Sequence, residues 1–437
     1  MAVRVSDGGA VTVGLLGCGT VGQAVVRSII EGGATIERAS GHRLQLGPIL
    51  VRDASKPRPG VDPALITTDP QRVLADPSVS IVVEVMGGLD PTLDHLRQAL
   101  AAGKSVVTAN KQLLARHGPE LLEAAEQAGA ELRFEVSACA AIPVIKVLRE
   151  SLLAAEITAV TGIVNGTTNF ILTEMSRQGL AYGDALGRAQ ALGYAEADPT
   201  EDVNGADAAA KMAILSSIAF HSRVLIDDVP YEGIDNLHAE DIEHAHSLGF
   251  VVKLLGVARL LNGAVSVRVY PALVPHGHRL AAIGGPDNAV LLESRTTREI
   301  MLVGPGAGGD ETASAVVADI LSILGTHQGS FLHNAMADSG RTIARPGSVA
   351  SAFYLRMSVA DRPGVLARVA SIFGDESLSI RSVVQSGSGD EASLVLILHA
   401  GAEERMDAAV ARVRALDDVR GEPVLLRVLG DGEGGDR

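Results

Sequence analysis

A glycine-rich turn close to the N-terminus joins an apolar strand to a helix, and it limits the possible folds more than any other feature. Residues 11–16 (VTVGLL) are followed by Gly17-Cys18-Gly19-Thr20-Val21-Gly22 and then by a helical pattern. In such a G-x-G-x-x-G turn the first glycine permits the sharp turn, and the second lets a pyrophosphate approach the helix N-terminus. The third permits close packing of helix on strand. The turn therefore predicts a dinucleotide-binding unit; a purely structural glycine-rich turn is the alternative.

Apolar strands and helical stretches alternate from this turn to about residue 145. The expected strands lie at 46–53, 81–88, 105–111 and 132–138, and the expected helices lie at 90–103 and 119–129. Strands that alternate with helices are typical of a parallel sheet with right-handed crossovers. We therefore predict that residues 1–145 form a Rossmann-type, doubly wound α/β domain.

The pattern changes after residue 145. A long helical run at 184–221 and a strand at 264–274 predict an α+β domain over 146–335, whose helix at 312–324 returns to the first domain. The polar, Gly- and Pro-containing segment 336–350 is typical of a linker. Residues 351–430 follow the order β-α-β-β-α-β, which predicts a ferredoxin-like domain.

The composition excludes several classes of partner. The formal net charge is -15 and no long run of Lys and Arg interrupts it, so neither nucleic acid nor an anionic membrane is an expected partner. Two cysteines, Cys18 and Cys139, cannot form a disulfide framework and lack zinc-site spacing. No apolar run is long enough for a membrane span and no signal layout begins the chain, so we expect a cytoplasmic protein.

The end of the second expected strand bears on the choice between the two nicotinamide dinucleotides. Arg52 and Lys56 together favour a 2′-phosphate and therefore NADP, whereas the intervening Asp53 keeps NAD open. A solvated pair of surface cations is the alternative for Arg52 and Lys56.

Two groups of residues are candidates for the site, and the first suggests proton chemistry at a carbonyl. Asp207 and Lys211 stand four apart on one face of an apolar helix, where a partly buried lysine suits a proton donor. An ordinary i,i+4 salt bridge is the alternative. The stretches 108–111 (TANK) and 134–143 (FEVSACAAIP) each follow an apolar strand, at the sheet edge where ligands bind in open α/β folds.

Taken together, these motifs resemble those of the homoserine dehydrogenases. The resemblance covers residues 11–335 through GLLGCGTVG, VVEVMGG, TANK, FEVSACAAIP, NGTTNFIL, LGYAEADPTEDVNGADAAAK and GPGAGGDETASAVVAD. The segment Ala360-Asp361-Arg362-Pro363-Gly364-Val365-Leu366 resembles an ACT domain, a module that commonly binds regulatory amino acids. The resemblance implies reversible reduction of aspartate 4-semialdehyde to homoserine with NADPH or NADH. It also implies a homodimer built by the second domain, or a homotetramer built through the ACT domain, and an amino-acid effector such as threonine.

The resemblance also assigns roles to individual residues. It implies that Lys211 is the general acid and base, that Glu196 and Asp207 bind substrate, and that Asp202 and Lys111 lie beside the site. Cofactor contacts are implied for the glycine turn (Gly17, Gly19, Thr20, Val21, Gly22) and for Arg52, Lys56, Gly87, Thr108, Lys111, Gly193 and Gly308. A monovalent cation, sodium or potassium, is implied at Glu135 and at the carbonyls of Ala138, Ala140 and Ile142.

The chain departs from the family pattern at two places. Ala140-Ala141 stand where two glycines are usual, and alanine disfavours positive φ, so we expect a displaced cation loop or a narrower nicotinamide pocket. Asp310-Glu311 follow the GAGG loop, and we expect both to point outward, away from a phosphate-bearing ligand. These departures keep two alternatives open: a catalytically weak regulatory homologue, and a dehydrogenase for a related semialdehyde.

Overall fold

The computed structural model describes residues 10–325, 350–387 and 390–428, which form two compact units separated between residues 325 and 350. The predicted linker lies outside the described residues up to position 349, and residue 350 begins a strand.

The first unit begins with a six-stranded parallel sheet of order β3-β2-β1-β4-β5-β6. Every residue of β1 and β4 is buried, as expected for parallel strands covered on both faces. The strands are β1 (Ala10–Leu16), β2 (Arg43–Leu50), β3 (Ile66–Thr67), β4 (Val79–Glu84), β5 (Ser105–Thr108) and β6 (Leu132–Arg133). The predicted Rossmann-type α/β fold is confirmed.

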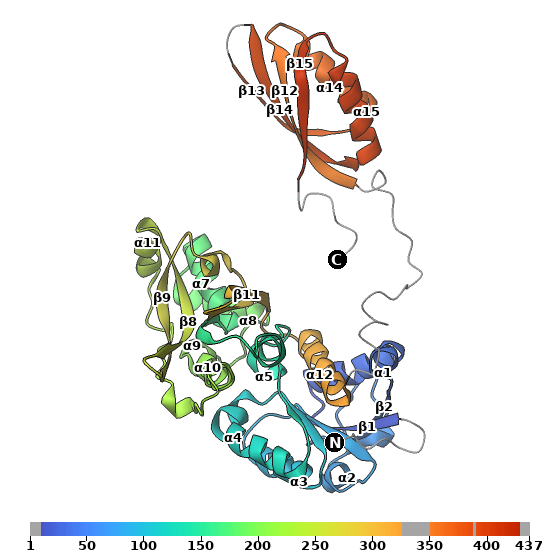
Figure 1. The fold of residues 1–437 in the computed structure, drawn as a ribbon, viewed down its shortest axis with the longest axis vertical. Helices are drawn as coiled ribbons and strands as arrows, with labels where there is room; N and C mark the ends of the chain where they lie inside the picture. The colour runs from blue at the N-terminus through green and yellow to red at the C-terminus, as the bar shows by residue number, and fades with distance from the viewer. Residues whose placement is uncertain (1–9, 326–349, 388–389, 429–437) are drawn as a thin grey trace. The chain divides into compact units, whose positions relative to one another are not determined.

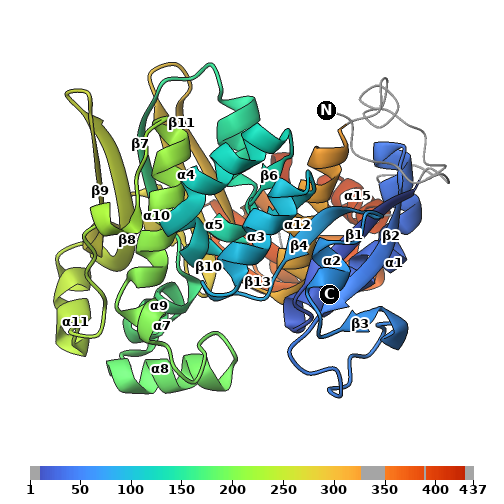
Figure 2. The ribbon, with the colours of Figure 1, turned by 90° about the horizontal axis from the view of Figure 1, so that it is seen from below.

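Helices cover both faces of this sheet (Figures 1 and 2). One apolar cluster joins the sheet to α1 and α12, and another joins it to α2, α3 and α4. The strand order reverses between β1 and β4, and ligands of open α/β sheets bind outside the carboxyl ends of the strands at such a point. The helices are α1 (Thr20–Ser40), α2 (Gln71–Leu74), α3 (Thr92–Ala101), α4 (Lys111–Ala128) and α12 (Gly309–Leu324), with a single 3₁₀ turn η1 (Pro63–Leu65).

The predicted strand at 132–138 is wrong beyond Arg133. The Phe134 carbonyl accepts hydrogen bonds from Ser137 N at 3.0 Å and Ser137 Oγ at 2.6 Å, which turns the backbone into a helix. Residues Val136–Cys139 therefore form α5 instead of extending β6.

A five-stranded antiparallel sheet of order β11-β10-β7-β8-β9 follows, with α7 and α10 packed against it. The predicted helical run at 184–221 is interrupted, because Gly193 has a φ of +79° and Pro199 precedes a new helix. The strands are β7 (Ile157–Ile163), β8 (Phe250–Leu261), β9 (Ala264–Pro275), β10 (Asp287–Ser294) and β11 (Arg298–Pro305). The helices are α6 (Val144–Lys146), η2 (Val147–Ser151), α7 (Gly166–Gln178), α8 (Tyr182–Ala191), α9 (Thr200–Val203), α10 (Ala206–Ala219), η3 (Ile226–Asp228), α11 (Ala239–Ser247) and η4 (Arg279–Ala282).

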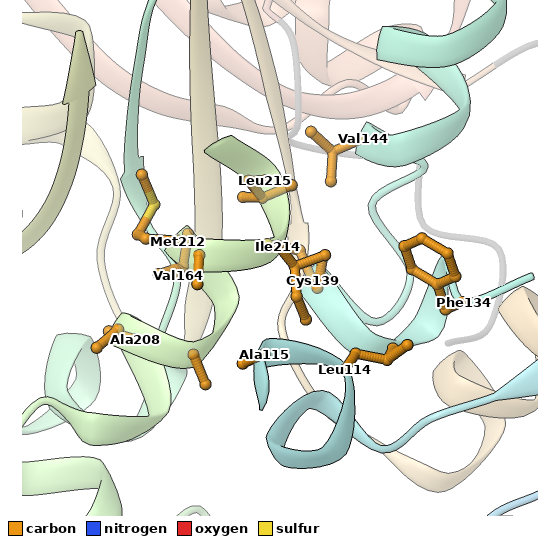
Figure 3. Packing of buried hydrophobic residues seen from close by; sticks show 14 of the residues in the cluster. Leu114, Ala115, Phe134, Cys139, Val144, Val164, Ala208, Met212, Ile214 and Leu215 are labelled. Carbon is orange, nitrogen blue, oxygen red and sulfur yellow. The ribbon is translucent and has the colours of Figure 1, made fainter. Parts of the chain in front are cut away.

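The two sheets of the first unit share one apolar core where α4 meets α10. Leu114 and Ala115 of α4 belong to the same buried cluster as Ala208 and Met212 of α10, and Cys139 joins them (Figure 3). This packing fixes the N-terminus of α4 against the first turns of α10.

The second unit has a four-stranded antiparallel sheet of order β13-β14-β12-β15, and its core also contains residues of α14 and α15. The predicted β-α-β-β-α-β order is confirmed by β12 (Ala350–Ala360), α14 (Val365–Asp375), β13 (Ile380–Ser386), β14 (Glu391–Ala402), α15 (Glu403–Arg414) and β15 (Val419–Val428). Within the described parts of the chain, no helix is both long and apolar enough to cross a membrane.

Candidate active site

The glycine turn between β1 and α1 has the shape that a dinucleotide needs. Gly17 has a φ of +106°, and a Cβ there would lie 2.8 Å from Met86 N; a Cβ at Gly22 would lie 2.6 Å from the Gly17 carbonyl. Both glycines are therefore required by packing. A Cβ at Gly19 would meet nothing within 4 Å, and the first turn of α1 has no acidic residue. The space outside Gly19 thus fits a pyrophosphate at the helix N-terminus.

The loop after β2 presents a cation that sequence reasoning missed. Arg52 and Lys56 are exposed, whereas the half-buried Arg58 folds back and donates from Nε to the Cys18 carbonyl at 3.1 Å. Asp53 is engaged locally, since its Oδ1 accepts from Ser55 N and Ser55 Oγ, and these bonds lower the pKa of its carboxyl. The one sequence feature that could have identified Arg58 was its position in the same basic loop as Arg52.

A buried carboxyl group supports the edge of the sheet beside the glycine turn. Glu84, which ends β4, accepts from Thr108 Oγ1 at 2.5 Å and from the amides of Met86 and Gly87 at 2.9 Å. Burial raises the pKa of this carboxyl against the effect of those three bonds. Asn110, the N-cap of α4, donates to the Gly88 carbonyl at 2.6 Å. Glu84, Thr108 and Asn110 together join the loop at 85–88 to the N-terminus of α4, which begins with Lys111.

Two lysines meet one carboxylate where α4 contacts α10. Asp207 Oδ1 lies 2.5 Å from Lys111 Nζ, and Asp207 Oδ2 lies 2.9 Å from Lys211 Nζ. The side chains of Asp207 and Lys211 are 3% and 10% exposed, and that of Lys111 is 35% exposed. The structure therefore brings together three predicted site residues, Asp207 and Lys211 from α10 and Lys111 from the first turn of α4.

The charges of this cluster support one another. Burial alone would raise the pKa of Asp207, but the ammonium groups of Lys211 and Lys111 outweigh it and hold that pKa well below the usual range. For Lys111, burial alone would lower the pKa of the ammonium group, but the nearby Asp207 carboxylate outweighs burial and raises that pKa. Asp207 is therefore a carboxylate and Lys111 an ammonium group at neutral pH, and Lys211 lies on the other side of the carboxylate.

A second acidic group stands beside the first. Asp202 accepts from Asn165 Nδ2 at 2.8 Å and from Thr167 Oγ1 at 3.1 Å, and Asn165 Nδ2 also donates to Asp207. Burial and the negative charge of Asp207 raise the pKa of Asp202. Sequence reasoning predicted Asp202 but missed Asn165 and Thr167, whose only signal was their place in the NGTTN motif.

The loop between α8 and α9 lies next to the cluster, yet its predicted acidic residue does not join it. The Tyr194 carbonyl accepts from Thr167 Oγ1 at 2.7 Å, which ties the loop to α7. Glu196 is exposed, and its side chain has no hydrogen bond or ion pair in the described part of the chain. The space beside the Gly193 Cα is open, because a Cβ there would meet no atom within 4 Å.

The loop before α12 shows one acidic side chain turned outward and one turned back. Asp310 is exposed and pairs with Arg27 of α1, as predicted. The expectation for Glu311 is wrong, because its carboxylate lies against Gly308, so close that no Cβ would fit there. Gly308 has a φ of +141°, and the amides at the N-terminus of α12 attract the carboxylate.

The predicted cation loop is built around a buried carboxyl group. Glu135 accepts from the Ile145 and Lys146 amides at 2.7 Å each, while its own amide donates to Asp319 at 2.8 Å. Burial is the main cause that raises the pKa of Glu135 to about 7 and that of Asp319 to about 6. Two amides already occupy the Glu135 carboxyl group, so a cation in this loop would depend mainly on backbone carbonyls.

Ala140 has a positive φ, the backbone conformation that alanine disfavours. Its φ is +42° and its ψ is -103°, a region that residues with a Cβ rarely adopt. Next to it, burial raises the pKa of the Cys139 thiol to about 11, which makes it an inert packing group at neutral pH. Across the described residues, no group of three or more His, Cys, Asp or Glu side chains could hold a metal ion.

Known proteins match the chain over nearly its whole length. The homoserine dehydrogenase family model matches residues 143–321, the model of its NAD-binding domain matches 17–135, and the ACT domain model matches 353–418. Homoserine dehydrogenase from Corynebacterium glutamicum is 43% identical over 97% of each chain, and that from Mycobacterium tuberculosis is 43% identical over 97% of this chain and 98% of its own.

Solved structures give the same result. A homoserine dehydrogenase from Thiobacillus denitrificans has a TM-score of 0.71 at 40% identity, covering 96% of this chain and 98% of its own. A hyperthermophilic archaeal homoserine dehydrogenase in complex with NADPH has a TM-score of 0.61 at 29% identity, covering 72% of this chain and 97% of its own. These matches favour a homoserine dehydrogenase over both alternatives. The chain belongs to the homoserine dehydrogenase family of oxidoreductases and ends in an ACT domain.

Proposed function

We propose that the chain reversibly reduces aspartate 4-semialdehyde to homoserine, with Lys211 as the general acid and base. The observation that carries the proposal is the ion-paired cluster in which Asp207 is held between Lys211 and Lys111, the latter at the N-terminus of α4, which follows β5. A buried ammonium group next to a carboxylate can give a proton to a developing alkoxide and take it back in the reverse direction.

The side chains of the site would transfer the proton and bind the substrate, and hydride transfer would be left to the cofactor. When bound, the nicotinamide supplies or accepts the hydride. Lys211 holds the proton that the carbonyl oxygen needs, and its Nζ is aimed by Asp207 and by the Val164 carbonyl, 2.8 Å away. Asp207 and Asp202 offer negative charge to the substrate amino group, and Glu196 adds a third carboxylate when its loop turns toward the cluster. Lys111 lies where α4 begins, next to Thr108 and the loop at Gly87.

NADP is the cofactor that the loop after β2 favours. Arg58 adds a third cation to Arg52 and Lys56, and its guanidinium is tied to the glycine turn itself. The archaeal neighbour's complex with NADPH supports the same preference. Asp53 is the group that would bind a free ribose hydroxyl, and its bonds to Ser55 compete with that role.

The remaining assignments concern a cation, an effector and the assembly. We propose a sodium or potassium ion at the carbonyls of Ala138, Ala140 and Ile142 with Glu135, where it would brace the junction of the two domains. Threonine is the proposed effector of the ACT domain, and a cytoplasmic homodimer or homotetramer is the proposed assembly.

The reaction is tested with purified protein, homoserine and either oxidised cofactor, followed at the absorbance of the reduced nicotinamide. We expect turnover with both cofactors and faster turnover with NADP⁺. The Lys211→Ala substitution should lower the rate by a factor of about 10² to 10⁴. Absence of turnover at alkaline pH with sodium or potassium present would overturn the proposal. Near-normal turnover in Lys211→Ala would remove only the role of Lys211.

A further inference from the structure

A single asparagine joins the two acidic groups of the active site. Asn165 is 4% exposed, and its Nδ2 donates one hydrogen to Asp202 Oδ1 at 2.8 Å and the other to Asp207 Oδ2 at 2.9 Å. Asp207 is buried and Asp202 is half-buried, and the two carboxylates repel each other. The amide offsets this repulsion by giving one hydrogen to each carboxylate.

The amide of Asn165 can take only one orientation. Asn165 is the N-cap of α7, and its Oδ1 accepts from Thr168 N at 2.8 Å and Thr168 Oγ1 at 2.9 Å. A flipped amide would set its oxygen against two carboxylates and its NH₂ against a backbone N–H. The helix cap therefore fixes the donor toward the acidic pair.

The same short segment also positions the lysine. The carbonyl of Val164 accepts from Lys211 Nζ, and Asp207 Oδ2 is shared between Lys211 Nζ at 2.9 Å and Asn165 Nδ2. Residues 164 and 165 thus contact both members of the Lys211–Asp207 pair. Any change in the charge on Asp207 Oδ2 is transmitted directly to the ammonium group.

We propose that Asn165 is a positioning residue that sets the pH at which Lys211 exchanges its proton. The inference rests on the proposed role of Lys211 and adds a group that acts on it through Asp207. Loss of the amide donor leaves more negative charge on Asp207, which favours the ammonium form of Lys211. Homoserine oxidation needs the free amine as base, so the acid limb of its kcat profile moves to higher pH.

The experiment compares Asn165→Ser and Asn165→Asp in the full-length protein. Both replacements are good N-caps, so α7 keeps its cap while the bridge is lost. We expect kcat for homoserine oxidation near pH 8 to fall at least about 10-fold in Asn165→Ser. The acid limb moves to higher pH in both variants, and further in Asn165→Asp, which adds a negative charge. The KM for the cofactor changes little in either.

Asn169, one turn along α7, provides a matched control. It is equally buried, but its amide bonds the Asp287 carbonyl at 3.0 Å and Lys253 Nζ at 2.8 Å, facing away from the acidic pair. Asn169→Ser should lose stability in thermal unfolding and keep the wild-type pH profile.

Three outcomes separate the ideas. An unchanged pH profile in both Asn165 variants, or an equal shift in Asn169→Ser, would overturn the role of Asn165. A wild-type enzyme without turnover would instead overturn the proposed function on which it rests. A shift confined to the Asn165 variants, with a loss in kcat and not in cofactor KM, supports the inference.

Discussion

At the scale of single residues, the active site consists of groups whose chemistry depends on partners distant in sequence. Asp207 and Lys211 could be predicted because both lie on one helix, four residues apart. Asn165 could not, since its bonds to Asp202 and Asp207 span 37 and 42 positions and its remaining bonds are those of any helix cap. Arg58 was missed for a similar reason, because only the folded loop brings it to Cys18.

Ala140 gives a prediction about stability. Its positive φ costs of the order of 1–3 kcal/mol, whereas the added flexibility of glycine in the unfolded chain costs about 0.5–1 kcal/mol. Ala140→Gly should therefore raise the free energy of unfolding by about 1 kcal/mol. Ala141→Gly is the matched control, because Ala141 is not among the positive-φ residues, and it should lower stability. Urea unfolding measures both, and a destabilised Ala140→Gly would contradict the assignment of strain.

Arg58 gives a prediction about cofactor preference. A charge-assisted hydrogen bond is worth about 1.5–3 kcal/mol, so Arg58→Ala should lower kcat/KM for NADPH by about 10-fold or more. The value for NADH should change little, since NADH lacks the 2′-phosphate. Arg52→Ala serves as the comparison, with a smaller expected loss because its side chain is exposed. Equal losses with NADPH and NADH would show that Arg58 only supports the loop.

At the scale of helices and strands, the sequence predicted best those strands that are buried on both faces. Strands β1 and β4 are covered on both faces, so each is a continuous apolar run that sequence inspection finds easily. The wrong strand prediction at 136–138 arose because the Ser137 hydroxyl bonds the Phe134 carbonyl and turns the backbone. A pattern of apolar residues does not reveal that hydrogen bond. Glycine and proline signals at Gly193 and Pro199 were present, but the long helical pattern around them concealed the break.

Strand β8 contributes a buried lysine whose titration should affect stability. Lys253 donates to Asn169 Oδ1 and to the Ile283 carbonyl, and burial, with a smaller effect of Arg177, lowers its pKa to about 8. The unfolded chain binds this proton up to about pH 10.4, so the native state gains relative stability as pH rises from 8 to 10. The gain is lost as pH falls through 8.

Unfolding experiments across this pH range test the effect. The free energy of unfolding of the wild type, minus that of Lys253→Met, should increase by roughly 1–3 kcal/mol between pH 8 and pH 10. The exposed Lys56→Met should leave the wild-type slope unchanged. A constant difference between wild type and Lys253→Met would mean that Lys253 titrates normally.

At the scale of the whole molecule, the proposed catalytic residues and the ACT domain belong to separate units with separate cores. All of the proposed catalytic and cofactor residues lie between positions 17 and 308, in the first unit, and the ACT domain has its own buried cluster. The archaeal homoserine dehydrogenase aligns over 97% of its own length while covering only 72% of this chain. A homologue of that extent supports the view that the first unit is sufficient for the reaction.

Removal of the ACT domain tests this division. A chain ending at residue 335 should fold, retain turnover of homoserine and lose any change in rate that threonine causes in the full-length enzyme. Circular dichroism checks the folding and the nicotinamide assay checks the rate. A folded but inactive truncated chain would show that the second unit takes part in catalysis.

The shared core between α4 and α10 also decides how molecules enter and leave. Swinging the two sheets apart would expose Leu114, Ala115, Ala208 and Met212 to water at about 25 cal/mol per Å², and it would strip Asp207 of Lys111 (Figure 3). Substrate entry by a hinge-like opening of the two domains would therefore cost free energy in every catalytic cycle. Most of the loop at 192–199 is exposed, and Ala195 and the bond of the Tyr194 carbonyl to Thr167 hold it to the core. Movement of this loop would expose less apolar surface than separation of the sheets, so we expect changes at Gly193–Glu196 to alter the rate of product release.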